Sequence, residues 1–210
     1  MSTDQNTALT LPAAVEVTAF ELLRARVRQE VDAGLLPSAQ FAMAYRGQLI
    51  AFETFGDASN ESLYPIFSAT KAITSALSWL SIQAGALDLE APVANWIPAF
   101  KEGDKSLVKV IHLLTHTAGF PNAPFRPTDY FDQDRRQARF KQWRLEWPPG
   151  SRFVYHPTSS LWVLAEILEQ IHGRAFADMI KTDIAEPLAL PELFVGCPST
   201  RHSKIVPVSH

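Results

Sequence analysis

The sixteen residues between Lys71 and Asp88 carry no charge. Small and apolar side chains dominate this stretch, and Gly85 interrupts it. A helix that is apolar on nearly every side must be enclosed by other elements. We therefore predict a helix over residues 68–84 that is buried nearly all round. With 47% hydrophobic residues among 210, the chain can build the core that such a helix needs, as one domain or as a domain with a subdomain.

A β-hairpin is predicted on the amino-terminal side of this helix. Residues 39–45 and 48–56 are typical of two strands joined by a turn at Arg46 and Gly47. An isolated hairpin is marginally stable in water unless it packs on helices or pairs with further strands. Either helices of this chain cover the hairpin, or its remaining sheet partners lie outside these residues.

Most of the other segments predict helices. Residues 121–135, rich in proline, aspartate and aromatic side chains, predict a long loop, and residues 87–100 predict short helical turns between prolines. Residues 1–18 are expected to form a flexible amino-terminal arm, which leaves residues 19–210 as the domain. The further predicted helices span residues 19–33, 108–118, 138–147, 159–172 and 176–186.

Composition and charge exclude several classes of function. A formal net charge of -3 gives no electrostatic basis for binding nucleic acid or an anionic membrane. No apolar run reaches the ~18 residues that a membrane-spanning helix needs. The first twenty residues lack the basic start and apolar core of a signal peptide, so we expect a cytoplasmic protein. Cys197 is the one cysteine and predicts neither an internal disulfide nor a zinc site.

Ser68 and Lys71 stand three positions apart at the start of the uncharged helix. Residues with this spacing lie on the same helix face, about 5–6 Å apart between Cβ atoms. A helix start and partial burial both oppose a protonated amine, so a neutral Lys71 could deprotonate the Ser68 hydroxyl. Backbone N–H groups at the helix start could hold the oxyanion of an acyl-transfer intermediate.

The spacing alone is weak support, because serine is also an ordinary residue at a helix start. The chain contains a second match, Ser106 and Lys109, which we interpret as a helix cap followed by a solvated lysine. The first pair differs because a lysine at the mouth of a buried helix needs a reason.

Tyr155 is the candidate for the group that passes a proton to the leaving group. It lies between an extended Pro-Gly segment and an amphipathic helix, where a side chain can face a cleft. A tyrosine near a lysine loses its proton more readily than one alone, although a lone tyrosine is more often a half-buried aromatic. His156 is a second titratable group at this position, and it either takes a role or is simply exposed.

Three segments in this order resemble the beta-lactamase-related serine hydrolases. They read FSATKAITSALSWLSIQAGALDLEAPVANWIPAF, VIHLLTHTAGF and WPPGSRFVYHPTSSLWVLAEILEQIHGRAFADMIKTDIAEPLAL, and the similarity covers residues 20–198. The family includes class C beta-lactamases, D-alanyl-D-alanine peptidases and type VIII-like carboxylesterases. The resemblance implies an α+β fold with a helical subdomain packed on an antiparallel sheet.

The resemblance also implies roles for three residues. Ser68 would be the nucleophile, Lys71 the amine that activates it, and Tyr155 the general base and later the acid. The resemblance implies an acyl-serine intermediate, and it implies no metal or organic cofactor. His112 and His116, in the segment LLTHTAG, are expected to support the fold.

Two departures from the family pattern bear on the substrate. Penicillin-recognising members continue the tyrosine motif as Tyr-x-Asn, whereas this chain has Pro157, which offers no side-chain hydrogen bond. Loss of that amide argues against beta-lactam or peptide substrates and favours the esterase-like branch. The chain also ends at His210 without the third family motif, so we expect the carboxyl-terminal strands of the family fold to be missing from it.

Three functions follow from these expectations. The first is an esterase-like serine hydrolase acting on small ester or amide substrates. The second is a truncated, non-catalytic relative, and the third is a beta-lactamase or D-alanyl-D-alanine peptidase. The sequence leaves the acyl group and the oligomeric state undetermined. Phe125, Tyr130 and Phe131 of the predicted loop either line an apolar acyl pocket or pack on themselves at the surface.

Overall fold

The computed structural model describes residues 5–6 and 11–208. Residues 1–4 and 7–10 of the predicted amino-terminal arm lie outside the described part. Contacts divide the chain into two compact units, one of residues 1–65 and 197–210 and the other of residues 66–196. Helices together with a small antiparallel sheet confirm the predicted α+β class.

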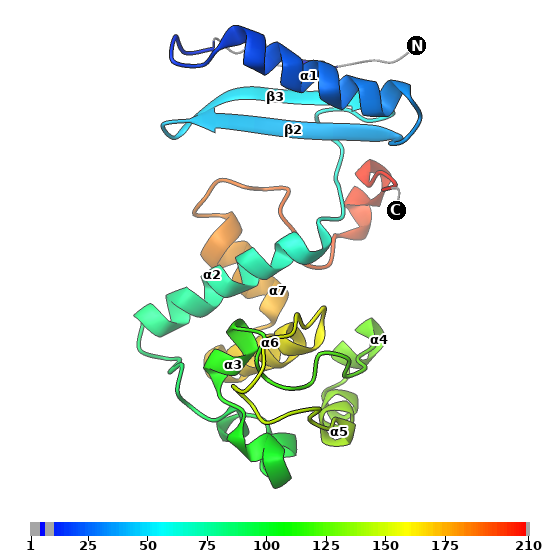
Figure 1. Ribbon diagram of the computed structural model, residues 1–210. Helices are drawn as coiled ribbons and strands as arrows, with labels where there is room; N and C mark the ends of the chain where they lie inside the picture. Colours follow the sequence, from blue (N-terminus) through cyan, green and yellow to red (C-terminus); the bar gives the residue numbers. More distant parts are fainter. Residues whose placement is uncertain (1–4, 7–10, 209–210) are drawn as a thin grey trace. The chain divides into compact units, whose positions relative to one another are not determined.

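The first unit contains the sheet and its hairpin (Figure 1). Strands β2 (Ser38–Tyr45) and β3 (Gln48–Gly56) form the predicted hairpin, and β1 (Gln5–Asn6) pairs with β3 in the order β1-β3-β2. Arg46 and Gly47 both have positive φ, 50° and 77°. This is the turn conformation that matches the twist of the flanking strands, so the predicted turn is confirmed.

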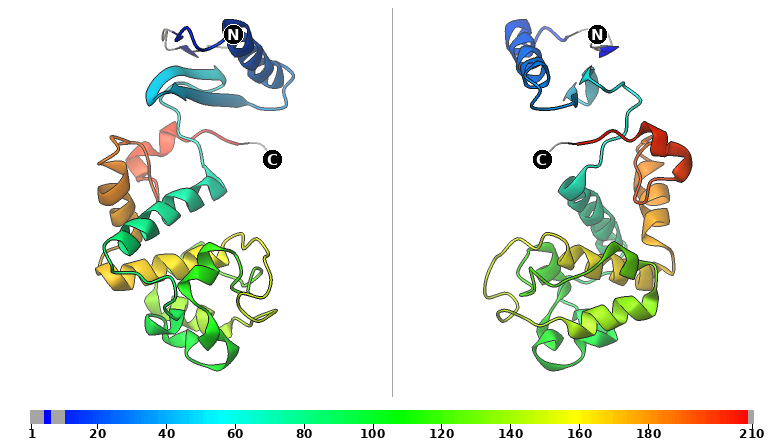
Figure 2. Two further views of the ribbon diagram at one scale, coloured as in Figure 1. Left: turned by 60° about the vertical axis from the view of Figure 1, so that its left-hand side comes forward. Right: turned by 90° about the vertical axis from the view of Figure 1, so that its right-hand side faces the viewer.

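Helix α1 (Val17–Asp32) lies along the hairpin in every view (Figures 1 and 2). Its buried residue Phe20 meets Phe41 edge-on at a centroid distance of 6.3 Å, and Phe41 stacks on Phe55 at 6.1 Å. A helix of this chain therefore covers one face of the hairpin. A 3₁₀ turn, Ser199–Lys204, completes the unit.

The second unit is built from helices and helical turns (Figures 1 and 2). Its α-helices are α2 (Thr70–Gln83), α3 (Val110–Leu114), α4 (Pro127–Tyr130), α5 (Gln133–Gln142), α6 (Ser159–His172) and α7 (Phe176–Met179). A π-helical stretch, Ile180–Ala185, continues α7. The 3₁₀ turns are Phe67–Ala69, Val93–Asn95, Pro98–Phe100 and Gly103–Leu107.

Helix α6 carries much of the core of this unit, as its amphipathic sequence predicts. Val163, Leu164, Ile167 and Leu168 are fully buried, because spacings of three and four place them on one face. Gly173, at φ 61°, ends the helix in the left-handed conformation that glycine adopts without steric cost. The predicted helix over residues 159–172 is confirmed.

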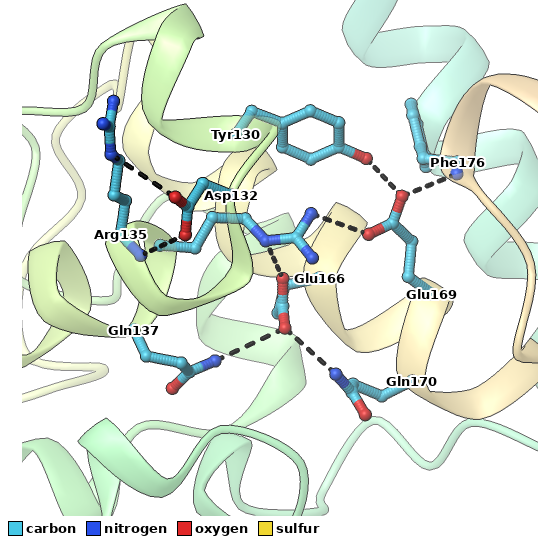
Figure 3. A network of polar contacts seen from close by, with 9 residues as sticks. Tyr130, Asp132, Arg135, Gln137, Glu166, Glu169, Gln170 and Phe176 are labelled. Atoms are coloured by element: carbon cyan, nitrogen blue, oxygen red, sulfur yellow. Dashed lines mark hydrogen bonds and ion pairs between the residues drawn. The ribbon is translucent and has the colours of Figure 1, made fainter.

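A polar network joins helices α4, α5 and α6 of this unit (Figure 3). Glu169 accepts a hydrogen bond from the Tyr130 hydroxyl at 2.5 Å and from Arg136 at 2.9 Å. Arg136 also pairs with the fully buried Glu166 at 2.8 Å. These charges are paired and hydrogen-bonded, as buried charges must be. Part of this network comes from residues 121–135, which were predicted to form a loop. That prediction is wrong for the residues of α4 and for the first residues of α5, which are helical.

Helix α5 begins and ends earlier than the predicted 138–147. Asp132 caps it, since its carboxylate accepts the N–H of the residue three positions later at 3.0 Å. Trp143 leaves the helix in an extended conformation, and its indole donates to the Pro124 carbonyl at 2.9 Å. The prediction is wrong at both ends because it missed the cap and this tertiary hydrogen bond.

Helix α2 is not buried all round, contrary to the prediction. Trp79 and Leu80 are 57% and 42% exposed. The hydroxyls on the inward face donate to carbonyls four residues earlier, so their own helix satisfies them. The absence of charged residues therefore predicted too much burial, because only one face of α2 is buried. Small polar residues form most of this buried stripe. Its members are Thr74, Leu77, Ser78 and Ser81.

Candidate active site

Ser68 lies in the 3₁₀ turn Phe67–Ala69 that leads into α2. The preceding Phe67 has φ 43°, a left-handed conformation that costs a non-glycine residue roughly 1–3 kcal/mol. Ser68 is exposed, and it belongs to a first helical turn, in which N–H groups have no acceptor within the helix. The local chain thus presents the Ser68 hydroxyl at the surface of this unit.

The three residues singled out from the sequence meet at one oxygen atom. The Lys71 Nζ atom donates to Ser68 Oγ at 3.1 Å, and the Tyr155 hydroxyl donates to the same Oγ at 2.8 Å. The Lys71 ammonium also lies 5.0 Å from the centroid of the Tyr155 ring. Tyr155 is 87 positions from Ser68 in sequence, so the fold of this unit brings them together.

The backbone at Pro157 holds the lysine in place. Lys71 Nζ donates to the Pro157 carbonyl oxygen at 2.6 Å, in addition to its bond to Ser68. The expectation from the sequence concerned only the side chain of Pro157, and so this acceptor was missed. No sequence signal identifies it, because every residue type has a carbonyl.

Two neighbouring groups favour the ionised form of the Tyr155 phenol. Its hydrogen bond with Ser68, and then its interaction with the Lys71 ammonium, lower the pKa of the Tyr155 phenol below its ordinary value of 10.0. The physical cause is that both partners can donate to a phenolate. A phenolate 2.8 Å from Ser68 Oγ is within reach of the hydroxyl proton that nucleophilic attack must remove.

A short loop after α3 supports residues 150–156, the tyrosine segment, which carries Tyr155. The helix predicted over 108–118 is shorter, since α3 ends at Leu114. The loop that follows accepts backbone hydrogen bonds from the tyrosine segment at 2.9 Å (Gly150 to Thr117) and 3.1 Å (Val154 to His116). These bonds hold the two segments side by side, like neighbouring strands.

The three histidines near this loop all accept backbone N–H groups. His112 Nδ1 accepts from Lys109, His116 Nδ1 accepts from His156, and His156 Nε2 accepts from Phe120, at 3.1, 3.1 and 3.2 Å. Burial is the main cause that lowers the pKa of each ring below 6.5. His156 is fully buried, so the alternative in which it is simply exposed is wrong.

The second serine–lysine motif does not form a pair. Ser106 donates to the Gly103 carbonyl at 2.6 Å, and Lys109 forms an ion pair with Glu90 at 2.8 Å. The prediction that Lys109 is solvated is confirmed, since its side chain is 43% exposed. Ser106 lies inside the turn Gly103–Leu107 and does not cap a helix.

The aromatic residues of the predicted loop mostly pack inside the unit. Phe125 stacks on Trp162 at a centroid distance of 4.7 Å, and Tyr130 lies 5.1 Å from the same ring. Phe131 is 87% exposed. Of the two uses considered for these aromatics, the contacts favour packing over an acyl pocket.

Across residues 5–6 and 11–208, no cluster of three or more histidine, cysteine, aspartate or glutamate side chains is arranged to hold a metal ion. None of the helices in that part of the chain combines the length and apolar character that crossing a membrane requires.

Comparison with known proteins extends this description. The family model described as Beta-lactamase matches residues 23–204. Esterase EstB from Burkholderia gladioli is 28% identical over 213 residues, covering 85% of this chain. A beta-lactamase from Yersinia enterocolitica is 25% identical over 146 residues, covering 69% of this chain. The crystal structure of a penicillin-binding protein homologue from Caulobacter crescentus superposes with a TM-score of 0.79 over 98% of the chain, at 26% identity.

The chain spans only part of the length of these proteins. It covers 54% of the esterase, 37% of the Yersinia beta-lactamase and 56% of the penicillin-binding protein homologue.

Proposed function

Because the chain belongs to the beta-lactamase family, we propose that it carries the nucleophile of a serine hydrolase that acts through an acyl-serine intermediate. The observation that supports this most directly is the convergence of the Lys71 amine and the Tyr155 hydroxyl on Ser68 Oγ, at 3.1 and 2.8 Å. A nucleophile needs a base within hydrogen-bond reach, and here Tyr155 meets that requirement.

In the proposed first step, Ser68 Oγ attacks the carbonyl carbon of an ester while the Tyr155 phenolate takes the serine proton. The two hydrogen bonds that Lys71 donates, to Ser68 and to the Pro157 carbonyl, keep its positive charge beside the phenolate. The tetrahedral intermediate collapses when Tyr155 returns the proton to the departing alkoxide. This leaves the acyl group on Ser68 and releases an alcohol.

In the second step, water attacks the acyl-serine and Tyr155 takes a proton from that water. The bond to Ser68 Oγ then breaks, the serine regains the proton, and a carboxylic acid leaves. The backbone N–H of Ser68 would contribute to the oxyanion site in both steps, since it lies in a first helical turn. Every group named here lies in residues 66–196.

We propose small esters, rather than beta-lactams, as the preferred substrates, with small amides as the alternative class. Pro157 offers a backbone carbonyl, which Lys71 occupies, and no side-chain amide to hold an amide substrate. The similarity to a protein named esterase EstB supports the same choice. The expected cytoplasmic location stays a prediction.

The test is hydrolysis of p-nitrophenyl butyrate together with labelling by a fluorescent fluorophosphonate. We expect Ser68→Ala to lose both activities and the matched variant Ser106→Ala to keep both, because Ser106 binds the Gly103 carbonyl instead of a base. Turnover that survives in Ser68→Ala would contradict the proposal. A folded chain that neither reacts nor hydrolyses ester would support a non-catalytic relative, and labelling of Ser68 by a fluorescent penicillin would favour a beta-lactam substrate.

A further inference from the structure

His116 forms hydrogen bonds with the backbone on both sides of Tyr155. Its carbonyl oxygen accepts the Val154 N–H at 3.1 Å, and its ring Nδ1 accepts the His156 N–H at 3.1 Å. The His116 ring also lies against the Tyr155 ring, with 4.9 Å between centroids. One residue thus contacts the residue before the tyrosine, the tyrosine itself and the residue after it.

The residue that makes these contacts has a left-handed backbone conformation. His116 has φ 58°, in the left-handed region that few non-glycine residues adopt. Non-glycine residues persist in this conformation where the surrounding structure overdetermines them, and such positions cluster at functional sites. Here the backbone carbonyl and the ring nitrogen of one residue act on the same short segment.

A second histidine extends the support inward. The ring of His156 accepts the Phe120 N–H through Nε2 at 3.2 Å, and its Nδ1 lies 2.6 Å from the Val154 carbonyl, to which it donates. The side chain of His156 therefore anchors the segment to the core, while its backbone N–H is the donor to His116. The tyrosine segment is fixed from two sides.

We propose that His116 is a positioning residue that holds the Tyr155 hydroxyl on Ser68 Oγ. The inference rests on the proposed function, in which Tyr155 moves the serine proton. His116 acts through the backbone of residues 154–156 and through ring packing, and it needs no contact with the substrate.

The hydrogen bond from His156 requires a neutral His116 ring, because Nδ1 can accept the His156 N–H only when it carries no proton. The titratable groups that face this ring are Lys71, His156 and Tyr155. Burial, His156 and the Lys71 charge lower the pKa of His116, so the ring is neutral at neutral pH.

Two substitutions separate the ring from the backbone. His116→Gly removes the ring and accepts φ 58° without strain. His116→Asn keeps an acceptor at the position of Nδ1, tolerates the left-handed conformation better than most residues, and does not titrate. His112→Ala is the matched control, since the His112 ring also accepts a backbone N–H, from Lys109, and lies beside Gly150, five positions before Tyr155.

The measurement is the ionisation of Tyr155, followed by NMR of protein labelled with ¹³C at tyrosine Cζ and assigned with Tyr155→Phe. In the native protein Tyr155 should ionise below the ordinary tyrosine pKa, through its contacts with Ser68 and Lys71. We expect its ionisation to move toward the ordinary value of 10.0 in His116→Gly and to stay low in His116→Asn and His112→Ala. An unchanged Tyr155 titration in His116→Gly, or an equal change in His112→Ala, overturns the proposal.

The kcat and KM of ester hydrolysis, measured on the same variants, give a second test. A misplaced catalytic group can cost about 100-fold, so we expect kcat of His116→Gly to fall by that order with little change in KM, and His116→Asn to recover most of it. Native kcat in His116→Gly overturns the proposal. If no variant, the native protein included, hydrolyses ester, the proposed function fails while the NMR titration still decides the positioning role.

Discussion

The chain contains the same serine–lysine spacing twice, and the two copies have different surroundings. Ser68 and Lys71 bond to each other and to groups from residues 155–157. Ser106 and Lys109 each bond elsewhere, to a carbonyl of the same turn and to an exposed glutamate. Spacing alone thus creates no site. A distant segment must supply the base that faces the hydroxyl and the acceptor that holds the amine.

Replacing the lysine of each serine–lysine pair should give the largest difference in activity between the two copies. Lys71→Met keeps much of the apolar stem but removes both donated hydrogen bonds. We expect a loss of roughly 10³- to 10⁴-fold in kcat/KM for p-nitrophenyl butyrate, as when one member of a cooperating catalytic set is removed.

The matched variant Lys109→Met loses an ion pair with Glu90, both partners being well exposed, which contributes about 0–1 kcal/mol to stability. Its kcat/KM should equal that of the native protein. Equal losses in the two variants would show that the first motif is no more special than the second.

A pair of tyrosine variants sharpens the comparison further. Tyr155→Phe removes the hydroxyl that bonds Ser68, so we expect kcat to fall about 10²- to 10³-fold with little change in unfolding free energy, because the side chain is 44% exposed.

Tyr130→Phe removes a hydroxyl that bonds the partly buried Glu169, and it should show the reverse pattern. We expect it to keep its activity and lose about 1–2 kcal/mol of stability, measured by urea unfolding. A loss of activity in Tyr130→Phe as large as in Tyr155→Phe would contradict the separation of roles.

The smallest expected effect is a dependence of stability on pH. His112 supports the start of α3 beside Lys109, and His116 and His156 support Tyr155, so both regions rely on neutral rings. Their pKa values in the folded protein lie below the ordinary 6.5. The unfolded chain therefore binds protons first, and the stability that is present above pH 6.5 is lost as the pH falls through the folded pKa values.

Urea unfolding between about pH 5 and pH 8 measures this dependence. Stability should decrease toward the acid end, and replacement of His112 by Ala should weaken the decrease only in part, because the rings beneath Tyr155 still titrate. A stability that is constant or rises on acidification would contradict the neutral tautomers described for these rings.

Local features of the sequence were predicted well where they depend on near neighbours. The turn at Arg46 and Gly47 and the end of α6 at Gly173 follow from backbone conformations that few residues accept. The cap at Asp132 was available in the sequence and was missed. The burial of α2 was predicted too broadly, because satisfied hydroxyls can face a core.

The candidate site divides in the same way. The i, i+3 spacing of Ser68 and Lys71 predicts a shared face, and the family resemblance supplies Tyr155. Three features could not be predicted: the hydrogen bond from Lys71 to the Pro157 carbonyl, the positive φ of Phe67, and the hydrogen bonds of His116 beside Tyr155. The direction of a carbonyl and the sign of φ are set by the packing around them.

By itself, the sequence determined the helix ends marked by glycine and the shared helix face of Ser68 and Lys71, since these depend on local geometry. Its resemblance to a known family implied the α+β class and the role of Tyr155. The tertiary structure alone decided which serine–lysine pair meets a tyrosine 87 positions away, and which backbone atoms hold that tyrosine and the lysine in place. The reason is physical: contacts between distant segments form only when a core fixes both, and no short stretch of sequence records where that core places them.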